Sequence, residues 1–136
     1  MAARRTVTTV TAIALQWLAL TVALASVVVH AGAALDDYVS PNLDGLFIFL
    51  AAFLLAGLLG MTVESPKVLV PLTFGMCITA SAIYGGVIYS PVWLDISTGS
   101  VTLQNYASEQ ALLIFLWTLI PAITGALTGY LTRGDR

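Results

Sequence analysis

The sequence predicts an all-α membrane protein with four transmembrane helices in an antiparallel bundle. Of its 136 residues, 59% are hydrophobic and only 9% are charged, whereas about a quarter of the residues in a soluble domain are charged. The apolar residues also fall into four blocks, each reaching the roughly 20 residues that a helix needs to cross a bilayer. We therefore expect a single domain with spans at about 7–30, 42–63, 66–90 and 108–131.

The first span follows Arg4 and Arg5. A cleaved signal peptide is the alternative interpretation, because a basic start, an apolar stretch and the small residues 31–34 resemble its three parts. The apolar stretch is longer than the roughly 7–15 residues of a signal-peptide core, so we expect a retained span. One face of this helix is small and polar, and we expect it to contact other helices. It carries Thr9, Ala12, Gln16, Ala19, Ala23 and His30.

Three Ser-Pro pairs occur at equal intervals in the chain, at 40–41, 65–66 and 90–91. Serine caps a helix start and proline fits its first position, so each pair predicts a helix start. The second pair follows a very short connection, which predicts a tight hairpin of spans two and three. The third pair is followed by a polar segment, 91–107. We expect this segment to form an outer cap, either a short β-hairpin or an interfacial helix beginning at Pro91.

Small residues recur at helical spacing in the second and fourth spans. Ala52, Ala56 and Gly60 form one such row, and Gly125 and Gly129 form a GxxxG. Small side chains let helix backbones approach closely, so we expect these rows at helix contacts. Any row that the bundle leaves uncovered would favour self-association. Within the fourth span, Pro121 removes one backbone hydrogen bond and predicts a kink.

The charged residues predict the orientation. With four crossings, all five basic residues fall on one side together with Glu64 and Asp135, and the other five acidic residues fall on the opposite side. The positive-inside rule then places both termini and the 64–67 turn in the cytoplasm, with acidic loops outside. We expect Glu64 to form a solvated pair with the neighbouring Lys67.

Motifs of catalysis and cofactor binding are missing from the sequence. We find no phosphate-binding loop, HExxH, CxxC pair or nucleophile elbow. The chain has one His and one Cys, His30 and Cys77, and its carboxylates are scattered, which disfavours a metal site. Its five basic residues are dispersed, which disfavours nucleic-acid binding. We therefore expect no catalytic, cofactor-binding or metal-binding residues and no enzymatic activity.

Two functional hypotheses remain. The first is a structural or accessory membrane protein that self-associates or packs against a larger assembly, such as a complex subunit or a viral-envelope-type protein. The second is a small channel or transporter for a neutral or weakly polar solute. Its path would be lined by Gln16, Ser81, Tyr84 and Thr118, with a bend at Pro121. His30 is interpreted as an interfacial residue, with a pH-sensing or haem-ligating role as the alternative.

Overall fold

The computed structural model describes residues 2–35, 41–94 and 101–134. They form four helices, α1 (Ala2–Leu35), α2 (Pro41–Thr62), α3 (Pro66–Trp93) and α4 (Val101–Arg133), and no strand is found in these ranges. Each helix contains a stretch long and apolar enough to cross a membrane. This confirms the predicted all-α membrane fold with four spans. Alternating passage through a bilayer stays a prediction.

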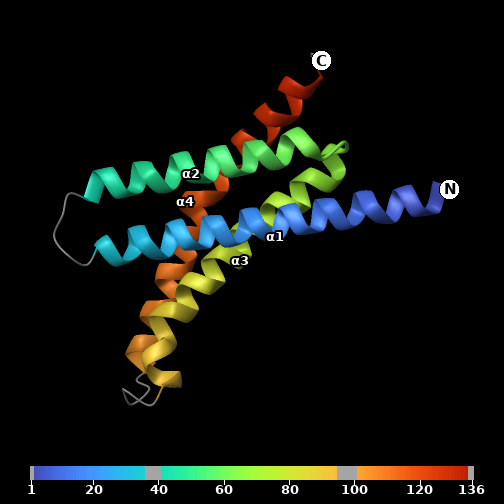
Figure 1. Ribbon diagram of the computed structural model, residues 1–136. Coiled ribbons are helices and arrows are strands. Elements are labelled where there is room, and N and C mark those ends of the chain that lie inside the picture. Colours follow the sequence, from blue (N-terminus) through green and yellow to red (C-terminus); the bar gives the residue numbers. More distant parts are fainter. Residues whose placement is uncertain (1, 36–40, 95–100, 135–136) are drawn as a thin grey trace.

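The helices form two pairs. Figure 1 shows α1 beside α2 and α3 beside α4, with opposite directions within each pair, and the two pairs cross instead of sharing one axis. The largest contact joins α2 to α4, followed by α3 with α4, and α1 packs on both α2 and α3. The ends of α3 and α4 nearest Trp93 and Val101 therefore project away from α1 and α2 (Figure 1).

The short connection between α2 and α3 does not produce a tight hairpin. Only residues 63–65 separate the two helices, yet α2 and α3 make the smallest of the principal helix contacts. The predicted close pairing of spans two and three is therefore wrong. The physical reason lies in the small-residue face of α2, which is held by α4, so that α3 leaves the turn in a different direction.

The polar segment after the third Ser-Pro pair is mostly absorbed into the flanking helices. Pro91 lies inside α3, which continues to Trp93, and α4 already begins at Val101. The parts of the predicted hairpin strands at 92–93 and 101–104 are therefore helical, and Pro91 does not begin a separate helix. Residues 95–100 lie outside the described residues. Ser90 offsets the N–H that Pro91 lacks, because its hydroxyl donates to the Val87 carbonyl at 2.7 Å.

The face of α1 that packs against the other helices is not the predicted one. Leu20, Leu24 and Val28 are buried, whereas Ala12, Ala19 and His30 are exposed and Gln16 is half-buried. The expectation that the small and polar face contacts other helices is therefore wrong. Large apolar side chains fill the space between the crossing pairs, and the small face of α1 is left towards the outside.

Candidate functional site

The α2–α4 contact is the closest helix contact in the described chain. A Cβ atom added to Gly125 would overlap the Phe53 carbonyl, and one added to Gly129 would overlap the Gly57 carbonyl. Gly60 is equally restricted by the Ala126 carbonyl. The two backbones touch, which only glycine permits. The sequence predicted this use of Gly60, Gly125 and Gly129, but it missed Gly57, which lies outside the regular rows.

Hydroxyl side chains in the spans mostly bond to their own helix. Thr73 donates to the Leu69 carbonyl and Thr118 to the Ile114 carbonyl, each at 2.9 Å and each fully buried. The exposed hydroxyls of Thr124 and Thr128 also donate to carbonyls four residues earlier, at 2.8 Å. Such bonds satisfy hydroxyls in apolar surroundings. These groups therefore need no water-filled path to be stable.

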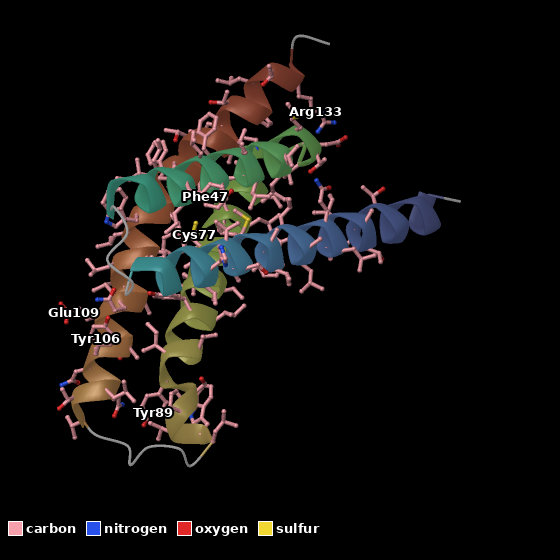
Figure 2. All side chains as sticks on the ribbon, turned by 60° about the vertical axis from the view of Figure 1, so that its left-hand side comes forward. Phe47, Cys77, Tyr89, Tyr106, Glu109 and Arg133 are labelled. Carbon is pink, nitrogen blue, oxygen red and sulfur yellow. The ribbon has the colours of Figure 1, made fainter. Side chains whose placement is uncertain are left out.

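A small buried polar cluster lies between α3 and α4. The buried Cys77 thiol lies near the Thr118 hydroxyl, and Ser81 and Tyr84 lie one and two turns further along α3. The Ser81 hydroxyl is the buried side-chain group without a hydrogen-bond partner in the described residues. The structure therefore gathers three of the predicted path residues, Ser81, Tyr84 and Thr118, in a packed core. Figure 2 shows Cys77 in the middle of the molecule.

Gln16 lies on another helix than that cluster, and Pro121 lies one turn beyond Thr118 on α4. Gln16 lies half-buried on α1, and among the described residues no hydrogen bond of its amide is found. Pro121 is fully buried, and α4 continues as a helix across it. Four of the five predicted path residues therefore lie on α3 and α4, and Gln16 lies on α1. The bend expected at Pro121 stays a prediction.

A second polar contact joins the ends of α2 and α4. Arg133 donates to the Glu64 carboxylate at 2.9 Å and to the Thr62 carbonyl at 3.3 Å. The arginine thereby pairs with the acidic residue of the turn and also bonds a free carbonyl at the end of α2. Glu64 was predicted to pair with Lys67, and the structure pairs it with Arg133 instead. The sequence did not indicate Arg133 as the partner of Glu64, because the two residues are far apart in the chain and only the packing of α2 on α4 brings them together.

Trp17 makes a long-range hydrogen bond between α1 and α3. Its indole N–H donates to the Leu72 carbonyl at 2.8 Å, and its ring lies on Gly75. Indole combines a large apolar body with one polar atom, so it both fills the space between helices and fixes their register. No sequence motif marked this residue, because its partner is a backbone carbonyl.

A groove opens between the projecting ends of α3 and α4, with a volume of about 350 Å³. We call it the α3–α4 groove. Its floor is made of small residues, and Tyr89 and Trp93 form an edge-to-face aromatic pair with ring centres 5.8 Å apart at its mouth. The lining comprises Ala82, Gly85, Gly86, Tyr89, Trp93, Gln104, Ala107, Ser108 and Ala111. None of these residues is charged.

The crossing of the two pairs leaves another open space, beside α1. It is lined by Val22, Ala25, Ser26, Val29, His30 and Ile83. His30 is exposed at its edge, and the Ser26 hydroxyl already donates to the Val22 carbonyl at 2.9 Å. Within the described residues, no three His, Cys, Asp or Glu side chains come close enough to hold a metal ion. His30 therefore has no described metal-ligand partners.

No protein-family model matches this chain, and neither a curated protein nor a solved structure matches it.

Proposed function

We propose that this protein is a non-enzymatic integral membrane protein with a structural or accessory role, which packs against a second copy of itself or against a larger membrane assembly. The observation that carries the proposal is Gln16. This amide lies within the first span, is only half-buried by the chain's own helices and has no hydrogen-bond partner in the described residues. Polar groups within a bilayer usually face another helix rather than lipid.

The packing of the glycine rows supports the outward face of α1, which carries Gln16, as the surface that contacts another chain. Gly125 and Gly129 are already engaged by α2, so they are not available for association between chains. The outward face of α1 instead repeats with alternating steps of three and four residues, the spacing of a helix-pair seam. It includes Ala12, Gln16, Ala19, Ala23 and Ser26. In a parallel pair of α1 helices, two Gln16 amides would meet and bond to each other.

Mild detergent purification with light scattering tests this proposal. We expect the parent to be a dimer or larger, or to carry a co-purifying membrane partner. Gln16→Leu should weaken self-association about fivefold, since interhelical polar contacts in membranes are worth roughly 1 kcal/mol. Gln110→Leu, the same change on α4, is the matched control and should leave association unchanged. A strictly monomeric parent with no partner would contradict the proposal.

The second candidate is a small channel or transporter for a neutral solute. It is supported by the gathering of Ser81, Tyr84 and Thr118 between α3 and α4, together with the unpaired hydroxyl of Ser81. A flux assay in liposomes with small neutral solutes distinguishes the candidates. The structural role predicts no flux above that of empty liposomes. Flux that is lost in Ser81→Ala would instead favour transport.

Both candidates share one proposed orientation, with the termini and the α2–α3 turn in the cytoplasm and the acidic loops outside. It is supported by the position of every basic residue near the termini or that turn. In a Cys77→Ala background, a membrane-impermeant maleimide should label Thr98→Cys on intact cells. Ser65→Cys should be labelled only after the cells are opened. The reverse pattern would overturn the orientation.

A further inference from the structure

We propose that the α3–α4 groove binds the uncharged sugar headgroup of a membrane glycolipid. The inference is independent of the proposed structural role, since it concerns a different pair of helices and a different measurement. It rests on three features of the described residues: the depth of the groove in the membrane, the absence of charge in its lining, and the aromatic and amide groups at its mouth.

The depth follows from helix length. About 20 helical residues cross the hydrocarbon layer at 1.5 Å per residue. Counted from the α2–α3 turn, this distance ends near Gly85 and Gly86, and counted back from Leu131 it ends near Ala111. The groove floor therefore lies at the far hydrocarbon boundary, and its mouth, with Trp93 and Gln104, lies at the level of the headgroups. Under the proposed orientation this is the outer leaflet.

The small floor residues create the groove without loosening the helix pair. At Gly85, an added Cβ would lie 3.0 Å from the Ala111 Cβ, so α3 and α4 are in close contact there. At Gly86, an added Cβ would meet the ring of Trp93 at 3.4 Å, so this ring folds back over the bare backbone of α3. A larger side chain at position 86 would displace the ring and fill the space.

The lining selects an uncharged polar ligand. A charged headgroup that leaves water needs an opposite charge nearby, and no lining residue supplies one. The nearby Glu109 points away from α3 (Figure 2). Sugar rings carry hydroxyls around an apolar C–H face. The rings of Tyr89 and Trp93 can cover that face, while the Gln104 amide and the Ser108 oxygen can bond the hydroxyls.

The shape and size of the groove favour a lipid over a free sugar. Its floor is apolar and lies at the hydrocarbon boundary argued above, where the first carbons of the lipid chains would lie. A volume of about 350 Å³ is near the lower limit of the roughly 300–1,000 Å³ typical of small-molecule sites. The groove therefore suits one ring-sized headgroup and not an extended oligosaccharide.

The test uses the full chain in nanodiscs, with native mass spectrometry of the lipids that stay bound. Four conditions are compared: phosphatidylcholine alone, with monoglucosyl diacylglycerol, with phosphatidylglycerol, and with free methyl glucoside. We expect one retained copy of the glucolipid and no retained phosphatidylglycerol. Retention of the anionic lipid in its place would overturn the proposal. Binding of methyl glucoside equal to that of the glucolipid would contradict the proposal that the occupant is a lipid.

Variants locate the site. Gln104→Leu should weaken glucolipid retention about fivefold, as expected for one lost neutral hydrogen bond. Asn105→Leu, the matched amide change at the next residue, should have no effect because Asn105 does not line the groove. Gly86→Leu should abolish retention. Since this variant could also disturb folding, Ser108→Leu at the exposed mouth provides a second block. Unchanged retention in Gln104→Leu and Ser108→Leu would refute the groove as the site.

Discussion

The two halves of α4 are packed in opposite ways, although both lie against glycines. Near its C-terminal end, Gly125 and Gly129 bring α4 into backbone contact with α2. Near its N-terminal end, Gly85 and Gly86 of α3 face Ala107, Ala111 and an open groove. In the first region glycine removes the space between helices, and in the second it leaves space for something else. The effect of a small residue on helix packing therefore depends on what lies opposite it.

The largest effect is expected from a substitution in the first region, the contact between α2 and α4. Gly125→Ala should destabilise the fold by at least about 3 kcal/mol, because the new methyl group overlaps the Phe53 carbonyl and neither backbone can move alone. Gly45→Ala on α2 is the control, since no atom lies within 4 Å of its added Cβ. It should be neutral or stabilising by about 0.5 kcal/mol. Unfolding in detergent measures both. Equal stability of the two variants would contradict the close contact.

The next effect comes from the contact between α1 and α3, which uses a large side chain instead of glycine. Trp17→Phe should destabilise by about 1 kcal/mol, because the bond to the Leu72 carbonyl is lost while most of the ring area is retained. Trp117→Phe provides the control, since the Trp117 side chain is 58% exposed and should matter little. The same unfolding assay compares them. A larger loss for Trp117→Phe would show that an exposed face of α4 is in fact covered.

The ion pair at the end of the α2–α4 contact should contribute less. Glu64 is 82% exposed and Arg133 is 39% exposed, so solvent weakens their attraction. Glu64→Gln should cost between 0 and about 1 kcal/mol, and the cost should shrink as salt is raised. Lys67→Gln, which removes a neighbouring charge outside the pair, is the control. A loss comparable to that of Gly125→Ala would mean that the ion pair, and not the glycines, fixes α4 on α2.

The smallest effect is expected in the second region. Gly85→Ala adds the same methyl group as Gly125→Ala, but it meets the Ala111 Cβ at 3.0 Å and not a backbone oxygen. Because the projecting ends of α3 and α4 can separate slightly, stability should stay within about 0.5 kcal/mol of the parent, helped by the better helix propensity of alanine. The same unfolding assay decides. A loss as large as that of Gly125→Ala would show that both halves of α4 are equally rigid.

The sequence by itself determined the class of protein and the number of spans. Long apolar blocks leave few alternatives, because backbone groups in a bilayer must be paired within a helix. It also identified Gly60, Gly125 and Gly129 as contact residues, since close approach has a strict local requirement. Its errors concern which residues and helix faces contact one another. The small face of α1 was assigned to the interior, and Glu64 was assigned to the neighbouring Lys67.

The tertiary structure alone decided which faces meet. Hydrophobicity alone cannot determine which face of a membrane helix turns towards the other helices, because lipid and protein interior are equally apolar. The outcome depends on which pair of faces gives the closest packing, and here the α2–α4 glycines prevailed. Their contact turned α3 away from α2, brought Arg133 to Glu64 and left Gln16 only half-buried. The α3–α4 groove also arises from two separate helices, so no single stretch of sequence encodes it.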